Sequence, residues 1–222
     1  MLRFRYKALR AATALVLGIG LTTPIAAPAA NAAAGQPGPI QLQNALLTAA
    51  DLPKGYLPHA SSSTRLVSNV ASDTNICDHK IPQSHVNLAT TSFIRVPGPM
   101  MFETLSETGP SAARAIVAAI ATAPRLCRNV HNVRGSAIAG NLHLSANLHL
   151  TALRVPRLGD ASAALAFTVR PAGLNTTVQG KLISVARGSV TVTILLLNTP
   201  RNDQRELNLI ATTAVRKLDR VL

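Results

Sequence analysis

Alternation of apolar and polar residues between Asn141 and Leu153 constrains the fold of this chain more than any other feature. Every second side chain from Leu142 to Ala152 is apolar, and polar side chains occupy the positions between them. Successive side chains of a β-strand point to opposite faces of a sheet. The pattern therefore predicts a strand with one buried face and one solvated face.

Three further runs with strand character follow this segment. They cover Ala163–Arg170, Thr176–Arg187 and Ser189–Leu197. Only the surroundings of Gly188 separate the last two runs, and a single glycine between two strands indicates a hairpin tip or a bulge. We therefore expect four consecutive strands, between residues 142 and 197, to form an antiparallel meander.

The first half of the chain predicts a helix and a hairpin. A short helix is expected over Gln41–Ala50, and it should end before Pro53 because proline disfavours helical geometry in the preceding residue. The polar stretch 61–76 predicts a loop with one short edge strand. Residues 89–96 and 100–106 have β-prone sequences on either side of Pro97-Gly98-Pro99, which predicts a hairpin or a sharply bent strand.

Two more helices complete the predicted order. The first covers Ala112–Leu126, because Pro110 suits a first helical turn and several apolar side chains share one face. Pro124 is expected to end or distort it. The second runs from Asp203 to about Val221. The order helix, hairpin, helix, four strands, helix predicts an α+β domain, with an antiparallel sheet of about five to six strands, helices packed on one face and a possible cleft.

The first 32 residues have the three parts of a secretory signal. Four basic residues precede an apolar run from Ala11 to Leu21, and a small-residue tail ends at Ala32. The apolar run is shorter than the about 20 residues that a transmembrane helix needs. We expect cleavage after Ala32, a Gly/Pro/Ala linker over 33–40, one domain over 41–222 and a secreted protein with no membrane span. An uncleaved anchor is the alternative.

The net charge of +13 suggests nucleic acid binding until the charges are placed. Four of the 22 basic residues lie in the signal, and the nearest approach to a cluster elsewhere is Arg125, Arg128 and Arg134. No aromatic residues alternate with these arginines, so platforms for stacking bases are missing. We therefore expect no specific nucleic acid partner, whereas a weak attraction to anionic cell-envelope polymers or lipid headgroups is compatible with the charge.

Cys77 and Cys127 are the only cysteines of the chain. A secreted protein meets an oxidising environment, and an isolated pair there is most simply a disulfide. Closing a loop of about 50 residues would stabilise the fold by about 4 kcal/mol in the chain-entropy model. The alternative is a metal or redox site that adds His79 and His131 to the two cysteines, although the spacing matches no established zinc finger.

Other candidate sites are weaker. His143 and His149 would lie about 20 Å apart on one strand, too far to share a metal, and are expected to be surface residues. Glu103 and Glu107 would be about 13 Å apart, too far for paired glycosidase carboxylates, and are expected to be structural surface charges. A calcium loop at Asp73 fails at the glycine and glutamate positions. Hydrolase and phosphate-loop motifs are absent, so we assign no catalytic, cofactor or metal residue.

Several short motifs are similar to one family. They are Leu46-Leu47-Thr48-Ala49-Ala50-Asp51-Leu52-Pro53-Lys54-Gly55-Tyr56, the Ala-rich helix ending near Cys127, Leu158-Gly159-Asp160-Ala161-Ser162, Ala186-Arg187-Gly188-Ser189-Val190, and the basic terminal helix. This set, spread over most of residues 41–222, resembles the PknH-like extracellular domain family, a group of actinobacterial sensor domains named after a membrane serine/threonine kinase.

The resemblance implies an antiparallel sheet flanked by helices, with a cleft that binds an unidentified ligand, in a secreted or membrane-tethered protein. This chain departs from the kinase in having no kinase domain and no membrane span, and it has one cysteine pair where the kinase sensor is expected to have two.

The expected function is therefore a secreted, non-catalytic binding or sensor-like domain. Its partner would be a small molecule or a cell-envelope component, held in a cleft between sheet and helices. The alternative is a secreted hydrolase with an active site outside the known motifs. Ser, His and Asp side chains converging in a cleft would favour that alternative. The sequence specifies neither the ligand nor the oligomeric state.

Overall fold

A computed structural model describes the chain over residues 37–59, 65–70, 74–76, 79–81, 86–127, 130–131, 134–135, 142–143, 146–171, 175–198 and 204–222. Between residues 65 and 86, and between 130 and 146, the description covers the backbone of the strands only. Residues 34–222 form one compact unit.

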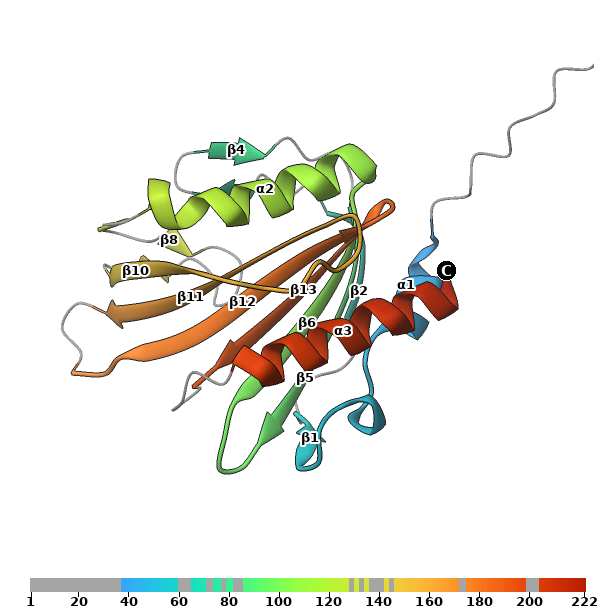
Figure 1. Ribbon diagram of the computed structural model, residues 1–222, viewed down its shortest axis with the longest axis horizontal. Helices are drawn as coiled ribbons and strands as arrows, with labels where there is room; N and C mark the ends of the chain where they lie inside the picture. The colour runs from blue at the N-terminus through green and yellow to red at the C-terminus, as the bar shows by residue number, and fades with distance from the viewer. Residues whose placement is uncertain are drawn as a thin grey trace, which may run out of the picture. The chain divides into compact units, whose positions relative to one another are not determined.

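The unit is built on a nine-stranded antiparallel sheet in the order β1-β5-β6-β13-β12-β11-β10-β7, with β2 also paired to β5 (Figure 1). The sheet has more strands than the expected five to six, because short strands add to its six strands of eight residues or more. The six longer strands are β5 (Val86–Arg95), β6 (Met100–Glu107), β10 (Ala146–Leu153), β11 (Ala161–Pro171), β12 (Val178–Arg187) and β13 (Val190–Leu197).

Short strands complete the β-structure. Three lie toward the sheet edges: β1 (Tyr56–Pro58), β2 (Arg65–Val70) and β7 (Val130–His131). Two further pairs stand apart from the sheet: β3 (Thr74–Ile76) with β4 (His79–Ile81), and β8 (Arg134–Gly135) with β9 (Leu142–His143). The edge strand expected within the polar stretch is confirmed as β2.

The predicted meander is confirmed, because β10, β11, β12 and β13 pair consecutively and antiparallel. Gly188 lies in the β12–β13 turn with φ +57°, in the region that favours glycine. The predicted hairpin is also confirmed as β5–β6, and it joins the meander through β13. The prediction of one strand over the whole alternating segment is wrong, because the segment is divided between β9, which pairs with β8, and β10, which pairs with β11.

In the part of the chain that the structure describes, three α-helices accompany the sheet: α1 (Pro39–Ala45), α2 (Pro110–Leu126) and α3 (Gln204–Val221). The expected helix over 41–50 is wrong after Ala45. There Leu46 has an extended backbone (ψ 145°), and a separate 3-10 turn covers Ala49–Asp51. Pro124 does not end α2 but sits in its last turns. Within the described residues, no helix is long and apolar enough to cross a membrane.

Helices pack on both faces of the sheet, so the expectation of a single helical face is wrong. On β12, Ile183 and Val185 belong to the core beneath α1 and α3, whereas Leu182 and Ala186 contact α2 on the opposite side. We call these two surfaces the α3 face and the α2 face (Figure 1). The nearly continuous apolar run of β12 is typical of a strand buried on both sides.

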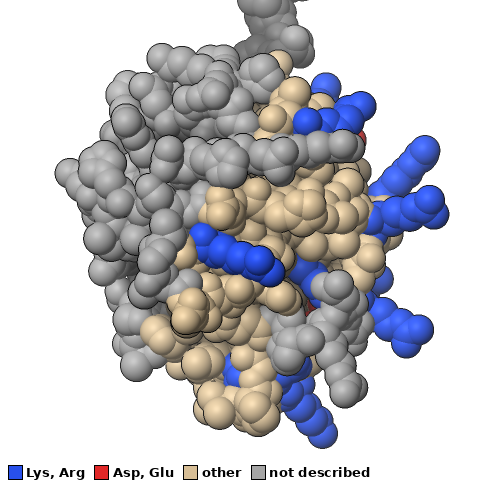
Figure 2. Space-filling model, turned by 90° about the vertical axis from the view of Figure 1, so that its left-hand side faces the viewer, with Lys and Arg blue, Asp and Glu red and all other residues tan. Residues whose placement is uncertain are grey.

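Charged side chains crowd part of the molecular surface. Figure 2 shows lysine and arginine side chains projecting into solvent, with almost no acidic surface visible in that view. The positions of the described acidic residues follow from their hydrogen bonds, ion pairs and burial, which are given below.

Candidate functional site

The motif at residues 46–56 packs the N-terminal segment against the sheet and α3 and forms hydrogen bonds with them. Leu46, Leu47 and Tyr56 are buried in the core of the α3 face. Asp51 accepts hydrogen bonds from Thr48 and from the Lys217 ammonium, the latter at 2.6 Å. Burial alone would raise the pKa of Asp51, but these hydrogen bonds outweigh it and lower the pKa. The motif is thus structural.

A second contact joins the sheet edge to α3. Arg95 on β5 makes a bidentate ion pair with Glu206 on α3, with N–O distances of 2.5 and 3.0 Å. The guanidinium carbon lies 5.0 Å from the centre of the Tyr56 ring, and the Tyr56 hydroxyl donates to the same carboxylate. Burial and the neighbouring Glu206 raise the pKa of Tyr56. This cluster fixes α3 against β1 and β5.

The motif around Asp160 and the motif around Gly188 contact each other through hydrogen bonds, and we call this contact the Asp160–Gly188 joint. The carboxylate of Asp160 accepts the Gly188 N–H at 2.7 Å, and the Asp160 N–H donates to the Ala186 carbonyl at 2.8 Å. Arg187 then pairs with Asp219 on α3 at 2.6 Å, and this hydrogen bond raises the pKa of Arg187. The joint closes the β12–β13 turn over the start of β11. It carries no reactive group.

The predicted disulfide stays a prediction. Cys127 is fully buried where α2 ends, at the position expected for an anchor, but Cys77 lies outside the described residues. His79 and His131, the other members of the metal alternative, lie on β4 and β7, where only the backbone is described. Among the residues whose side chains are described, no group of three or more His, Cys, Asp and Glu could hold a metal.

The two predicted surface histidines lie apart. His149 is exposed on β10, as expected, whereas His143 is on β9, in a different sheet from β10. The side chain of His143 is outside the described set. Asp73 and Asp78 of the rejected calcium loop are not among the described residues.

Glu103 and Glu107 are buried, so their assignment as surface charges is wrong. Their side chains point to the α3 face of β6, with relative exposures of 0% and 6%. Burial raises the pKa of Glu103 to about 8, against the opposing effect of the Leu47 N–H. Burial also raises the pKa of Glu107, opposed by a hydrogen bond with Asn87. The sequence did contain a signal for this burial. Glu103 and Glu107 lie at two-residue intervals from Met101 and Leu105, so all four side chains point to the same face of the strand.

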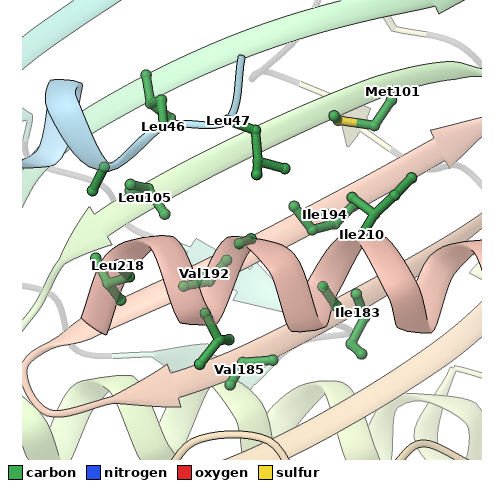
Figure 3. Packing of buried hydrophobic residues seen from close by; sticks show 14 of the residues in the cluster. Leu46, Leu47, Met101, Leu105, Ile183, Val185, Val192, Ile194, Ile210 and Leu218 are labelled. Carbon is green, nitrogen blue, oxygen red and sulfur yellow. The ribbon is translucent and has the colours of Figure 1, made fainter. Parts of the chain in front are cut away.

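The space between α3 and the described part of the sheet is filled by side chains, so no cleft is seen on this side of the sheet. Leu105, Val192 and Ile194 project from the strands toward Ile210 and Leu218 of α3, and all five are buried (Figure 3). A separate hollow of about 430 Å³ lies on the outer side of α3, lined by Thr213, Arg216, Asp219 and Arg220.

The α2 face is only partly covered by its helix. Helix α2 packs against β10, β11, β12 and β13, and no comparable packing of a helix on the β5–β6 part of this face occurs among the described residues. The surface formed here by the α2-face side chains of β5, β6 and β13 is the open half of the α2 face.

A row of hydroxyl groups crosses this surface. Thr90, Thr104, Thr193 and Ser184 are cross-strand partners on β5, β6, β13 and β12. The three threonines are half-buried, Ser184 is buried, and its Oγ lies 3.0 Å from Thr193 Oγ1. We call these four residues the hydroxyl row. At the usual strand spacing it extends about 14 Å across the sheet.

Apolar side chains lie directly beside the hydroxyl row. Phe102 and Leu195 occupy the next register position together with the buried Ser92, and Ile94, Met100 and Leu197 occupy the one after it. The five apolar side chains are half-buried. The charged residues of the same strands, Arg95, Glu103 and Glu107, point to the α3 face, as does Lys181 of β12. The described part of the open half is therefore uncharged, with a polar strip and an apolar strip.

Sequence reasoning missed this surface, although part of its signal was visible. The threonines and serine alternate with Ala89, Glu103, Val192 and Ile183 on their strands, so each hydroxyl could be assigned to the face opposite an inward residue. Their alignment into one row depends on β6 pairing with β13, and nothing in the sequence predicts that pair.

Comparisons with known proteins support the fold. No family model matches the sequence, and no curated protein matches it either. The crystal structure of the extracellular domain of PknH from Mycobacterium tuberculosis superposes with a TM-score of 0.51 and 10% identity, covering 84% of this chain and 98% of that one. A putative uncharacterized protein from Mycobacterium smegmatis, an Rv0999 ortholog, gives a TM-score of 0.47 and 9% identity, with 80% and 96% covered.

The similarity to the PknH extracellular domain shows a shared fold, because the identity is far too low to carry residues across. The α+β architecture expected from the sequence is thus shared with an extracellular domain of a known protein.

Proposed function

We propose that this chain is a secreted, non-catalytic binding module, and that it holds an uncharged amphipathic ligand on the open half of the α2 face. The fold shared with an extracellular domain and the secretory features of residues 1–32 support the location. The uncharged surface of β5, β6 and β13 supports the ligand class.

The observation that carries the proposal is the hydroxyl row beside two apolar rows. Each hydroxyl can donate one hydrogen bond and accept others, which suits a ligand rich in hydroxyl or ether oxygens. The side chains of Phe102 and Leu195 would contact an alkyl or ring portion of the same ligand. Binding sites commonly combine a mostly apolar lining with a few placed polar groups.

The hydrolase alternative lacks a comparable observation. A serine or threonine nucleophile needs a general base within hydrogen-bond reach. The described neighbours of the hydroxyl row on the open half are other hydroxyls and apolar side chains. Steady release of p-nitrophenol from p-nitrophenyl butyrate, abolished by Thr104→Val, would establish the hydrolase and overturn the binding proposal.

The test uses n-dodecyl-β-D-maltoside below its micellar concentration, an uncharged probe with a polyol head and an alkyl chain. Amide resonances of β5, β6 and β13 should shift on titration. The double variant Thr104→Val/Thr193→Val keeps the shape of both side chains and removes two hydroxyls. Its affinity should fall by about tenfold or more, since a lost hydrogen bond typically costs about 1 kcal/mol.

The matched control is Thr151→Val, the same substitution at an exposed position on the other face of β10. It should bind the maltoside as the unaltered protein does. Equal affinity of the double variant and the control, or resonance shifts confined to α3, would contradict the proposed site.

A further inference from the structure

One stripe of α3 faces solvent and is mostly cationic. Its residues follow one another at intervals of three or four, which places them on one side of a helix. They are Arg205, Leu209, Thr213, Arg216 and Arg220. We call this set the α3 outer stripe. The opposite side of α3 carries the buried residues, among them Leu207, Ile210 and Leu218.

The described acidic side chains are engaged by other parts of the fold, and none of them forms an ion pair with Arg216 or Arg220. The chain has nine acidic residues, and Asp73, Asp78 and Asp203 lie outside the described part. The other six are held as follows: Asp51 by Lys217, Glu206 by Arg95, Asp160 by Gly188, Asp219 by Arg187, and Glu103 and Glu107 by burial.

The arginines of the stripe border a hollow that could take an anionic group. Arg216 and Arg220 stand one turn apart, and with Thr213 and Asp219 they line the hollow of about 430 Å³. Within the described residues neither arginine makes an ion pair, whereas Asp219 is occupied by Arg187 at 2.6 Å. A guanidinium donates several hydrogen bonds in a planar fork that matches the oxygens of a phosphate.

Exposed apolar side chains lie on the same layer. Leu209 is 56% exposed in the middle of the stripe, and Ile40 is 71% exposed on α1, which packs beside α3. Helices that lie on membrane surfaces combine arginines with leucines in this manner, because the cations meet anionic headgroups while the leucines enter the boundary of the acyl layer. A soluble polyanion would make no use of these two side chains.

We propose that the α3 outer stripe docks the domain on an anionic lipid bilayer, with lipid phosphates beside Arg216 and Arg220 and with Leu209 in the interface. This inference does not depend on the proposed ligand site. The two surfaces lie on opposite sides of the sheet, so the open half of the α2 face stays accessible when α3 rests on lipid.

The experiment measures cosedimentation of the protein beginning at Ala34 with vesicles at physiological ionic strength. This unit contains both hydrophobic cores. Vesicles of phosphatidylcholine with one third phosphatidylglycerol should bind it, and vesicles of phosphatidylcholine alone should not. Arg216→Ser/Arg220→Ser should weaken binding by about 10- to 30-fold, as expected for two cations at an anionic surface.

The matched control is Arg114→Ser/Arg125→Ser, which removes the same charge from exposed positions of α2. It should retain nearly all binding. Leu209→Ser should weaken binding several-fold by an amount that salt does not change. Equal losses of vesicle binding in the two double variants would show that only the net charge of the protein matters. That result would overturn the proposal. Binding to soluble poly-glutamate without binding to the anionic vesicles would overturn it as well.

Discussion

The backbone N–H of Leu47 donates a hydrogen bond of 2.7 Å to the carboxyl group of Glu103, across 56 residues of sequence. Both partners are buried, and Glu103 lies on β6 near the middle of the sheet. This bond satisfies the backbone donor of Leu47, which lies beyond the end of α1 and is buried away from water. It gives the Glu103 carboxyl group a structural role in the core of the α3 face.

Glu103 should make the stability of the protein depend on pH. Its pKa in the folded protein is about 8, above the ordinary value of 4.5, so folding favours the protonated carboxyl. The stabilisation is complete at acid pH below the ordinary value and is lost as pH rises through about 8. The loss can reach about 1.4 kcal/mol per pH unit.

The comparison is with Glu103→Gln, which keeps an acceptor for Leu47 and cannot ionise. Urea unfolding between pH 5 and pH 8 should show a falling free energy of unfolding for the unaltered protein and a flatter profile for the variant. Asp51, Lys217 and Glu107 are common to both proteins and cancel in the difference. Parallel profiles would show that Glu103 does not titrate in this range.

Two glycines with nearly equal backbone angles should respond differently to alanine. Gly159 (φ +56°) lies where a Cβ atom would meet the Ala186 carbonyl oxygen at 2.4 Å, whereas a Cβ at Gly188 (φ +57°) would meet nothing within 4 Å. Gly188→Ala should therefore cost only the about 1–2 kcal/mol of a left-handed alanine. Gly159→Ala should cost more, about 3 kcal/mol or above, because steric overlap adds to that cost. Equal losses in urea unfolding would contradict the close contact.

Cys127→Ser should lower the free energy of unfolding by about 2–5 kcal/mol, the usual loss for a native disulfide. The burial of Cys127 beside α2 makes this residue a firm anchor for the segment that contains Cys77. Peptide mapping without reductant should recover Cys77 and Cys127 in one linked fragment. Free thiols at both positions, or stoichiometric zinc, would favour the metal alternative.

Much of the fold could be predicted because local patterns determine it. Alternation identifies β10, glycine identifies the turn at Gly188, and an apolar stripe identifies α3. The placement of α2 on the second face could not be predicted. The side chains that it covers on β11 and β12 are mostly alanine and leucine, which suit either face. The same limit applies to the pairing of β6 with β13, which is a contact between distant segments.

The candidate site was less predictable than the fold. The motifs that resembled a family have structural roles. Their side chains form hydrogen bonds between distant segments, as Asp160 does with Gly188 and Asp51 with Lys217. Single threonines such as Thr104 carry no motif, and they become a candidate site only when pairing aligns them with Thr90 and Thr193. A site made of cross-strand neighbours has no continuous sequence to recognise.

The most direct test of the binding proposal is native mass spectrometry of the protein purified from its own host, compared with Thr104→Val/Thr193→Val from the same host. The account predicts an added mass from an uncharged compound that carries both oxygen-rich and alkyl parts, and it predicts that the double variant loses this mass while remaining folded. A charged compound, or an added mass retained equally by the variant, would contradict a ligand site on the open half of the α2 face.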